Sequence, residues 1–448
     1  MNVLVLGAYG LIGREIASEL VRSGHQVTGL ARDASRGRAL LPGIAWIGAD
    51  IAKLTEPDLW RPHLAGIDAV VNAAGALQSG GRDDLKRLQR DAVVALVRAM
   101  ELGTGDEPGQ PATGRSGIAP SLRKFVQISA PGADPAAPTE FMATKGAADE
   151  ALRASHLDWT ILKPGLVIAP TAYGGTALIR MLAAFPLVQP VALAQTRIAT
   201  VDVAEVGRAV ARALADQSLS RRSYDLVETD PPTLLEIVLA FRRWLGFPAP
   251  ALVVATPAWL VAPVSALADL AGRLGWRPPL RSTAMRVLAG GVVGDPAPWQ
   301  TATGENCAPL AATLARLPAT RQERVFARLE LAFPLLLVML ALFWIASGTI
   351  GLWQREAAMA VLADAMPARS AAAAVVGGAL LDLGLGFGML IARWHRWALV
   401  GSIALSLAYL ALGTLLTPAL WADPLGPFAK VVPVIGLALA LLARGDER

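Results

Sequence analysis

Cysteine is nearly absent from this chain of 448 residues. The single cysteine, Cys307, excludes an intrachain disulfide and any metal site built from several thiolates. The four histidines, His25, His63, His156 and His395, lack the close spacing of metal ligands, and we assign structural roles to all of them. The sequence therefore predicts no metal centre.

Charged residues are also scarce, since they make up 17% of the chain while hydrophobic residues make up 54%. The net charge of +5 is not accompanied by any Lys/Arg-rich run with interleaved aromatic residues. Because nucleic-acid-binding proteins carry such runs to contact phosphates, we expect no nucleic-acid partner. The composition favours a soluble part joined to a membrane part.

Two segments near the C-terminus, 331–353 and 397–417, contain no charged residue. Each is long enough to cross the ~30 Å hydrocarbon core of a bilayer as a helix. Two further candidates are 370–392, which contains the single acid Asp382, and 425–443. Four such segments in close succession predict an all-α transmembrane four-helix bundle. A carboxyl group within a span is costly, so Asp382 is either a relay or ligand site or a hydrogen-bonding group between helices.

Arginines are unevenly distributed over the loops that flank these segments. They lie before the first segment, between the second and third, and after the fourth: Arg321, Arg324, Arg328, Arg393, Arg396, Arg444 and Arg448. By the positive-inside rule, this distribution places both termini in the cytoplasm. The N-terminal apolar run is short and has no basic lead, so we expect no signal peptide. We therefore predict a multi-pass protein of the cytoplasmic membrane, with the lipid bilayer as a partner and the N-terminal domain in the cytoplasm.

Residues 2–13, NVLVLGAYGLIG, predict how that N-terminal domain begins. A buried-strand pattern leads directly into Gly7, Gly10 and Gly13. In a Rossmann nucleotide site, the first glycine makes a tight turn, the second admits a pyrophosphate, and the third lets the following helix pack on the strand. The free N–H groups of that helix then face the anion. The predicted cofactor-binding residues of this loop are Gly7, Tyr9, Gly10, Leu11, Ile12 and Gly13.

Strand and helix signals alternate beyond this loop. Expected strands are 2–6, 26–31, 44–47, 68–72, 124–128, 159–162 and 224–227, and the clearest helical patterns are 84–102, 139–155 and 202–215. This alternation predicts an α/β fold with a doubly wound parallel sheet. Residues 103–120 are rich in glycine, proline and small polar residues and predict a surface insertion.

We expect three regions along the chain. Residues 1–245 form the Rossmann domain, 246–325 a proline-rich connecting region, and 326–448 the membrane bundle. The prolines of the connecting region exclude a long regular element. This region either covers a substrate pocket, lies on the bilayer surface, or is a packed linker.

The end of the second strand predicts which dinucleotide binds. An acid there would accept from the ribose 2′-hydroxyl of NAD, whereas an arginine accommodates the 2′-phosphate of NADP. Arg32 occupies this place, and Arg36 and Arg38 add positive charge, although Asp33 is adjacent. We therefore expect NADP(H) rather than NAD(H) as the cofactor.

The ends of the third and fourth strands complete the predicted cofactor site. Asp50, followed by Ile51, is placed where a carboxylate can accept from the adenine amino group. The small residues after the fourth strand leave room for the adenine ribose. This second set is Asn72, Ala73, Ala74 and Gly75.

Taken together, these residues resemble the short-chain dehydrogenase/reductase superfamily, above all atypical and extended members such as NmrA-like proteins and the nucleotide-binding accessory subunit of respiratory complex I. The resemblance covers about residues 1–245. It rests on Gly7, Gly10, Gly13, Asp50, Asn72–Gly75, Ser129, Lys145, Pro164-Gly165 and Val201–Val203. The C-terminal segments resemble a DoxX-like membrane domain through their hydropathy pattern.

The resemblance implies hydride transfer at a nicotinamide, with a tyrosine as proton donor, a lysine that binds the nicotinamide ribose and a serine that orients the substrate oxygen. Ser129 and Lys145 match the serine and the lysine, and Pro164 joins the cofactor-binding set. However, Phe141 occupies the tyrosine position, and a phenyl ring cannot transfer a proton. Tyr173, in a loop that borders the substrate pocket in this fold, is the candidate substitute acid.

Three functions remain open at this stage. The first is a membrane-anchored NADP(H)-dependent oxidoreductase with an apolar substrate, such as a lipid, an isoprenoid or a quinone. The second, which Phe141 favours, is a non-catalytic NADP(H) sensor or an assembly factor for a membrane redox system. The third makes the spans the active part and rests on Asp382 alone. A membrane redox partner or a second copy of the chain fits each of them.

Overall fold

The computed structural model describes residues 1–76, 84–103, 124–276, 278 and 280–444. The chain divides into two compact units. Unit 1 comprises Met1–Ser265 and Pro279–Arg324, and unit 2 comprises Ala266–Pro278 and Val325–Arg448. The predicted insertion at 103–120 lies, beyond its first residue, outside the described residues.

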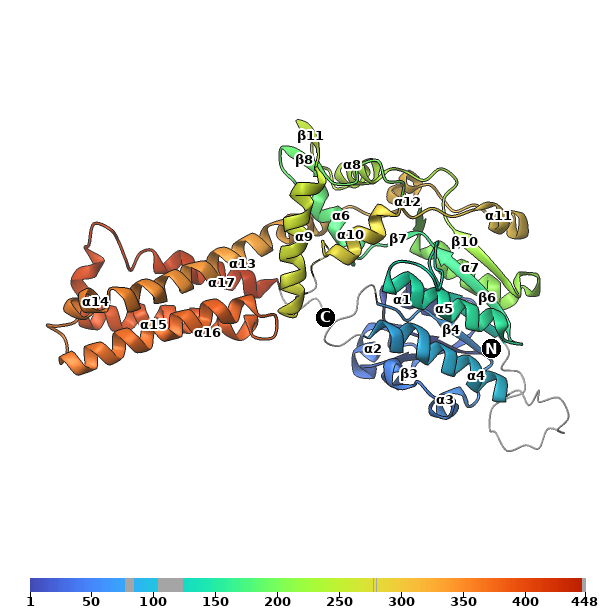
Figure 1. Cartoon of the computed structure of the whole chain (residues 1–448), viewed down its shortest axis with the longest axis horizontal. Coiled ribbons are helices and arrows are strands. Elements are labelled where there is room, and N and C mark those ends of the chain that lie inside the picture. The colour runs from blue at the N-terminus through green and yellow to red at the C-terminus, as the bar shows by residue number, and fades with distance from the viewer. Residues whose placement is uncertain (77–83, 104–123, 277, 279, 445–448) are drawn as a thin grey trace. The chain divides into compact units, whose positions relative to one another are not determined.

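A parallel sheet forms the centre of unit 1 (Figure 1). Its seven strands, counted over the described residues, run in the order β10-β6-β5-β4-β1-β2-β3, and every pair is parallel. They are β1 (Asn2–Leu6), β2 (Gln26–Ala31), β3 (Ala45–Gly48), β4 (Ala69–Asn72), β5 (Lys124–Ile128), β6 (Asp158–Pro164) and β10 (Arg222–Leu226). The winding reverses between β1 and β4, the switch point at which ligands bind in such sheets.

Helices cover both faces of this sheet. On one face lie α1 (Leu11–Arg22) and α7 (Val203–Ala215), and on the other lie α3 (Pro57–Leu64), α4 (Ala92–Gly103) and α5 (Glu140–Ala154). Alternate residues of β1 supply the two cores, because successive side chains of a strand point to opposite faces. The predicted doubly wound Rossmann fold is therefore confirmed.

The predicted elements also have nearly the expected bounds. All seven strands form, and the helices expected at 139–155 and 202–215 are α5 and α7. The segment 84–102 differs, because it begins with a π-helical turn, η2 (Lys86–Asp91), before α4. Three short helical elements lie in the connections between these strands and helices: α2 (Ala34–Leu40), η1 (Ile51–Lys53) and η3 (Gln217–Leu219).

The rest of unit 1 adds two small parallel strand pairs, β7 with β9 and β8 with β11. The elements are β7 (Leu166–Ile168), α6 (Gly175–Ala183), β8 (Val188–Val191), β9 (Thr200–Asp202), α8 (Leu234–Trp244), β11 (Leu252–Ala255), α9 (Ala258–Arg273), α10 (Ser282–Ala289), α11 (Ala297–Thr303) and α12 (Leu310–Arg316). Helix α9 ends within unit 2.

Polar contacts hold the second half of the predicted connecting region to the Rossmann domain. The buried Glu228 carboxylate accepts from the N–H of Thr200 and from the N–H of Leu310, both at 2.9 Å. The Arg316 guanidinium lies 3.0 Å from the Asp202 carboxylate. These contacts join residues 310–316 to Glu228, which follows β10, and to Asp202 at the start of α7. The domain boundaries that we expected along the sequence remain a prediction.

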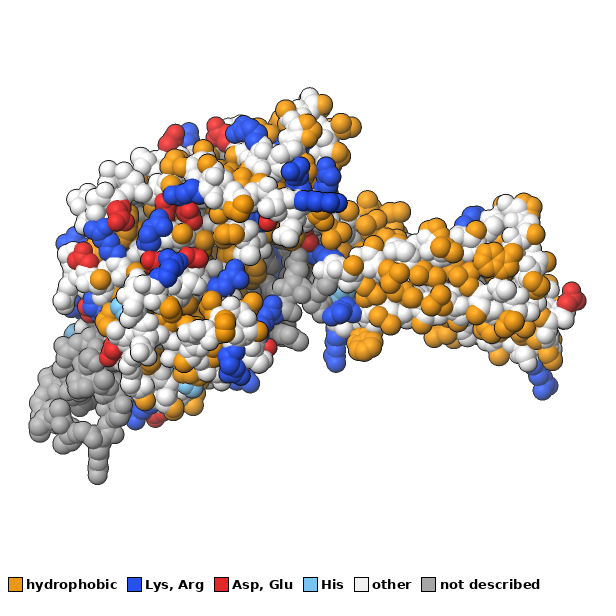
Figure 2. Space-filling view, turned by 180° about the vertical axis from the view of Figure 1, so that it is seen from behind, with side chains coloured by type: hydrophobic (Ala, Val, Ile, Leu, Met, Phe, Trp, Pro, Cys, Tyr) orange, Lys and Arg blue, Asp and Glu red, His pale blue; other side chains and the backbone are white. Residues whose placement is uncertain are grey.

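Unit 2 is mainly helical. Its elements are α13 (Arg321–Trp353), α14 (Arg355–Val361), α15 (Ala368–Leu390), α16 (His395–Leu416), η4 (Pro418–Trp421) and α17 (Val431–Ala443). Among the described helices, α13, α15 and α16 are long and apolar enough to cross a membrane. Figure 2 shows hydrophobic side chains over most of the visible surface of these helices.

The fourth predicted span, 425–443, forms only the shorter helix α17. At 1.5 Å per residue its 13 residues extend about 20 Å, less than the hydrocarbon core. The residues before it form turns, where Gly426 has a positive φ and Pro427 lacks an N–H. The bundle therefore has four helices, of which three reach spanning length.

Glycines set the distance between α13 and α15. A Cβ on Gly386 would lie 2.8 Å from the carbonyl oxygen of Ala341, and one on Gly348 would lie 2.5 Å from that of Ala379. Both distances are too short for a side chain, so only glycine permits this packing. Small residues serve the same purpose at helix contacts in other membrane proteins.

Asp382 lies on α15 inside this bundle and is 4% exposed. Its two carboxylate oxygens accept separate hydrogen bonds, from the Ser347 hydroxyl of α13 at 2.6 Å and from the Tyr409 hydroxyl of α16 at 2.8 Å. The carboxyl group thus links three helices. Of the two roles expected for Asp382, this geometry favours the bond between helices.

An ion pair joins the first and last helices of the bundle, α13 and α17. The Arg444 guanidinium, after α17, donates to both carboxylate oxygens of Glu330 on α13, at 2.8 and 3.0 Å. The same guanidinium lies over the ring of Phe333, 3.8 Å from its centre. The pair is therefore bidentate and largely buried, and it fixes the start of α13 and the end of α17 at one end of the bundle.

Candidate functional site

The glycine loop follows β1 directly and turns sharply. Gly7 has a φ of +70°, and its N–H donates to the carbonyl oxygen of Leu30 on β2 at 3.0 Å. A Cβ at this position would lie 2.9 Å from the Cα of Ala74, beyond β4. Both the conformation and the close approach require glycine.

The third glycine packs α1 against this turn. A Cβ on Gly13 would overlap the carbonyl oxygen of Gly7. Gly10 caps the helix, and the first intrahelical bond runs from the Arg14 N–H to the Gly10 carbonyl. The N–H groups of Leu11, Ile12 and Gly13 thus precede the helical hydrogen bonds and are oriented to bind an anion.

The ring of Tyr9 stacks on Trp46 of β3, with ring centres 6.2 Å apart. The Trp46 ring also fills the space beside Gly29 and Gly37, where a Cβ would lie within 3 Å of it. Its indole N–H donates to the Leu41 carbonyl. Trp46 therefore packs beside the glycine loop and against β2 and α2, a role that its isolated position in the sequence did not indicate.

The end of β2 carries a basic cluster. Arg32, Arg36 and Arg38 are exposed. The neighbouring Asp33 caps α2, because one carboxylate oxygen accepts from the Arg36 N–H at 3.0 Å and from the Ser35 hydroxyl at 2.5 Å. These bonds hold the pKa of Asp33 below its usual value. The adjacent acid thus has a structural partner.

Asp50 and Asn72 both shape the backbone at the carboxyl edge of the sheet. Asp50 accepts from the Ala52 N–H at 3.2 Å and caps η1, in which Ile51 is buried. The buried Asn72 accepts from the Ala74 N–H at 3.1 Å and donates to the Gln127 amide oxygen at 2.9 Å. Asn72 therefore holds the Ala73–Gly75 turn in place.

Lys145 and Ser129, far apart in the sequence, meet on the inner side of α5. The Lys145 ammonium donates to the Ile128 carbonyl at 2.8 Å, and the Ser129 hydroxyl donates to Asp149 at 2.6 Å. Burial lowers the pKa of Lys145 to about 8, although the Asp149 carboxylate opposes this shift. Burial also raises the pKa of Asp149. The lysine lies 5.8 Å from the ring centre of Phe141, one turn earlier on α5.

Asp149 and Gln89 are site residues that the sequence did not indicate. Both residues are at least 97% buried. The Gln89 Oε1 and the Asp149 Oδ1 form no hydrogen bond with the described residues. Gln89 lies on the π-helical turn η2, and its amide N–H donates to Ala76 at 2.6 Å. A Cβ on Gly75 would lie 3.7 Å from the Lys145 ammonium and 3.8 Å from the free Gln89 oxygen. An unused buried acceptor therefore lies beside the lysine that the resemblance assigns to the ribose.

The loop after β6 carries the other predicted residues. Pro164 ends β6, and the following Gly165 N–H donates to Leu226 of β10 at 3.0 Å. Tyr173 is 55% exposed, and its backbone bonds to the Thr176 hydroxyl at the start of α6. The buried Arg180 donates to the carbonyls of Ala169 and Pro170 and so anchors this loop. The structure therefore places Tyr173 on an exposed loop, whereas Ser129 and Lys145 are buried.

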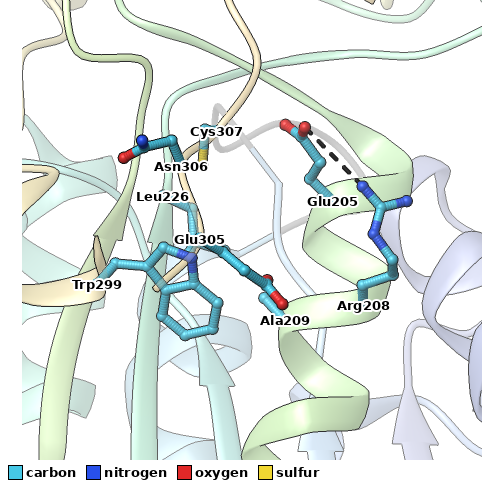
Figure 3. Close-up of a pocket in the computed structure, with 8 residues that line it drawn as sticks. All are labelled: Glu205, Arg208, Ala209, Leu226, Trp299, Glu305, Asn306 and Cys307. Carbon is cyan, nitrogen blue, oxygen red and sulfur yellow. Dashed lines mark ion pairs between the residues drawn. The ribbon is translucent and has the colours of Figure 1, made fainter. Parts of the chain in front are cut away.

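A separate small cavity of 210 Å³ lies between α7 and the residues around α11 (Figure 3). Figure 3 shows Trp299 and Cys307 on one side and the Glu205–Arg208 ion pair on the other. Burial raises the pKa of the Cys307 thiol to about 12, which keeps it protonated and unreactive. No predicted cofactor residue lines this cavity, and it is smaller than ordinary ligand pockets. Among the described residues, no three His, Cys, Asp or Glu side chains come together as metal ligands.

Comparison with protein families identifies two domains. The NAD(P)H-binding family matches residues 7–105, and the DoxX-like family matches residues 341–439. The first range contains the glycine loop, the basic cluster and the Asn72–Gly75 turn. The second contains the C-terminal part of α13 together with α15, α16 and most of α17.

Two curated relatives match the N-terminal part. The Photosystem II assembly factor Ycf39 of Synechocystis sp. is 27% identical over 251 residues, which is 55% of this chain and 68% of that protein. The uncharacterized protein YwnB of Bacillus subtilis is 33% identical over 98 residues, 22% of this chain and 42% of that protein.

Solved structures match the fold at low sequence identity. The enzyme WbmH of Bordetella bronchiseptica, in complex with NAD+, has a TM-score of 0.50 and 17% identity, covering 73% of this chain and 97% of that one. The NADPH-dependent quinone oxidoreductase QOR2 of Escherichia coli has a TM-score of 0.50 and 16% identity, covering 70% and 98%. At these identities the likeness shows the fold alone.

Proposed function

We propose that this chain, which joins an NAD(P)-binding Rossmann domain to a DoxX-like membrane domain, is a membrane-anchored NADP(H)-dependent oxidoreductase with an apolar substrate. The cofactor choice rests on one observation. The exposed side chains of Arg32, Arg36 and Arg38 gather at the end of β2, where Asp33 accepts from the Ser35 hydroxyl and the Arg36 N–H of α2. An arginine at the end of the second strand suits a 2′-phosphate.

The described residues fit a dinucleotide. Gly7, Gly10 and Gly13 leave room for the diphosphate, and the first N–H groups of α1 donate to it. Asp50 would accept from the adenine amino group, and the small residues Asn72–Gly75 would leave room for the adenine ribose. Lys145 and the free oxygen of Gln89 lie where two hydroxyls of the second ribose can bond to them. When bound, NADPH supplies a hydride at its nicotinamide ring.

The remaining chemistry is a proton transfer to the substrate oxygen. Ser129 orients that oxygen, and Lys145 holds the ribose. Phe141 cannot donate, so Tyr173 is our candidate acid, which requires its loop to close over the site. The DoxX-like domain supports an apolar substrate, because a membrane tether concentrates the protein where such molecules partition.

Specific observations favour a second function, an assembly factor or sensor that binds NADP(H) without turnover. The Ser129 hydroxyl is already bonded to Asp149, and Phe141 removes the usual acid. One relative is named as a Photosystem II assembly factor. In this case the dinucleotide stabilises the fold, and a partner in a membrane redox assembly binds the complex.

We also propose the orientation. The arginines in the first turns of α13, around the start of α16 and after α17 place the Rossmann domain and the C-terminus in the cytoplasm, by the positive-inside rule.

Cofactor choice can be tested on the full chain in nanodiscs. Arg32→Ala should weaken NADPH binding about tenfold, as expected for a lost charge-assisted bond of about 1.5 kcal/mol, and should leave NADH binding unchanged. Arg61→Ala, which removes an exposed arginine of α3, is the matched control. Equal losses for both dinucleotides would remove the phosphate role of Arg32.

Turnover then separates the two functions. NADPH oxidation is measured with a membrane-lipid extract, for the wild type, Tyr173→Phe and Phe141→Tyr. Turnover that Tyr173→Phe abolishes supports the oxidoreductase. Tight NADPH binding without oxidation, unaltered by Phe141→Tyr, supports the assembly factor or sensor instead.

A further inference from the structure

An uncharged apolar surface lies on unit 1, away from the cofactor residues. Two segments, 181–196 and 247–268, contain no charged residue and meet where β8 pairs with β11. All four residues of β11 are exposed, although their sequence is LVVA. Leu252 is 58% exposed and Trp259, at the start of α9, is 72% exposed. The other large apolar side chains of this surface are Leu187, Val188, Val253, Val254, Leu260 and Val264.

This surface is held rigidly by a buried arginine. The Arg242 guanidinium, on α8, donates to Phe185 and Pro248 carbonyls at 2.6 Å each, and to Ala183 and Pro186 at 3.1 and 3.2 Å. One side chain thus ties together the two uncharged segments. A strand pair fixed in this way presents its apolar residues as a permanent feature of the fold.

Such a surface is unusual in water. Exposed edge strands are ordinarily protected by charge, proline or a covering element, because an apolar edge invites aggregation. A contiguous apolar surface bordered by polar residues marks an interaction site. Figure 2 shows hydrophobic side chains at the projecting end where β8 and β11 lie, with Lys and Arg side chains beside it.

We infer that this surface, which we call the β8–β11 tip, docks onto the lipid bilayer. The tip residues are followed along helix α9 by Ala266, the first residue of the unit that carries the membrane helices, so the tip is tethered to that unit by a short stretch of chain. An exposed tryptophan suits the membrane interface. The exposed Arg243 and Arg324 lie at the start of the second segment, where a Cβ on Gly246 would be 3.7 Å from the Arg324 guanidinium carbon, and they suit anionic headgroups.

The expected mode is that of an interfacial protein element. Its apolar side chains enter the boundary between headgroups and acyl chains by ~5–10 Å, while the basic residues stay at headgroup level. The nucleotide domain then has a lipid contact of its own, in addition to the helices of unit 2. This inference does not depend on cofactor binding or catalysis.

The single cysteine makes the test simple. In a Cys307→Ala background, an environment-sensitive fluorophore is attached at Val253→Cys or Trp259→Cys, and at Leu59→Cys on α3 as the exposed control in the same unit. The full chain is reconstituted in nanodiscs of phosphatidylcholine with phosphatidylglycerol, at one copy of the chain per nanodisc. Nitroxide-labelled lipid should quench the labels at 253 and 259 several-fold more than the label at 59, and aqueous iodide should do the reverse.

Two results would overturn the inference. One is equal iodide quenching at all three positions. The other is protection that appears only when several copies share one bilayer, which would make the covering partner a second copy of the chain. Trp259→Phe in the otherwise unchanged chain gives an independent measurement. This substitution should remove a component of the tryptophan fluorescence that brominated lipids quench. If the quenched component persists in Trp259→Phe, the proposal is also contradicted.

Discussion

At the scale of single residues, the glycine loop leaves no space for another side chain. Gly13→Ala would force its methyl group against the Gly7 carbonyl oxygen. Such overpacking costs about 1–3 kcal/mol and displaces α1 from the diphosphate. We therefore expect the variant to lose NADPH binding, as measured by titration. We also expect the thermal midpoint of unit 1 to fall, as measured by scanning fluorimetry. Gly43→Ala, at a position with nothing within 4 Å, is the matched control and should change neither.

The buried lysine predicts a specific pH dependence. Burial lowers the pKa of Lys145 to about 8, whereas an unfolded lysine titrates at about 10.4. Between these pH values the unfolded chain binds more protons than the folded protein. The free energy of unfolding therefore increases as pH rises from about 8 to about 10. The stability of the wild type relative to Lys145→Met should increase over that window. The exposed Lys53→Met should show no such trend, and a flat difference for Lys145→Met would contradict the assignment.

The same residues show what could be predicted and what could not. The position of the glycines, Asp50 and Asn72 at strand ends was predictable because each belongs to a local pattern, while their contacts with a cofactor stay a prediction. Asp149 and Gln89 were not, because their importance comes from Ser129 and Lys145, which only the fold brings close. Tyr173 was proposed from its loop alone; the structure shows it exposed there, and its role stays a prediction.

At the scale of elements, alternating apolar strands and amphipathic helices predict the sheet well, because each pattern repeats over several residues. The π-helical start of 84–102 was not predictable, since it depends on packing rather than on composition. The length of α17 was overestimated for a related reason. A hydropathy average does not show that the residues before α17, including Gly426 and Pro427, form turns instead of helix.

The bond between helices at Asp382 gives a prediction for the bundle. Asp382→Leu would leave the Ser347 and Tyr409 hydroxyls without their acceptor, and hydrogen bonds between membrane helices contribute roughly 0.6–2 kcal/mol each. We expect a lower thermal midpoint in detergent, partly restored in Asp382→Asn, which keeps an acceptor oxygen. Leu380→Ala, an exposed position on the same helix, should have little effect. Unchanged stability of Asp382→Leu would favour a ligand or relay role.

At the scale of the whole molecule, the Arg444–Glu330 pair predicts the topology. Both residues lie at one end of the bundle, so the chain should enter and leave the membrane on the same side. Reporter enzymes fused at the N-terminus and after Arg448 should both be active in the cytoplasm. A C-terminal reporter active only on the opposite side would mean that α17 does not complete a crossing.

That ion pair also orders the steps by which the protein is made. Its partners are 114 residues apart, and the arginine follows the last helix. During synthesis, Glu330 therefore leaves the ribosome long before any counter-charge exists for it. The Glu330 carboxylate therefore stays without this guanidinium while α13, α15 and α16 are made, until α17 and Arg444 follow. A polypeptide that stops before Arg444 cannot form this ion pair, so it leaves Glu330 without the guanidinium that pairs with it.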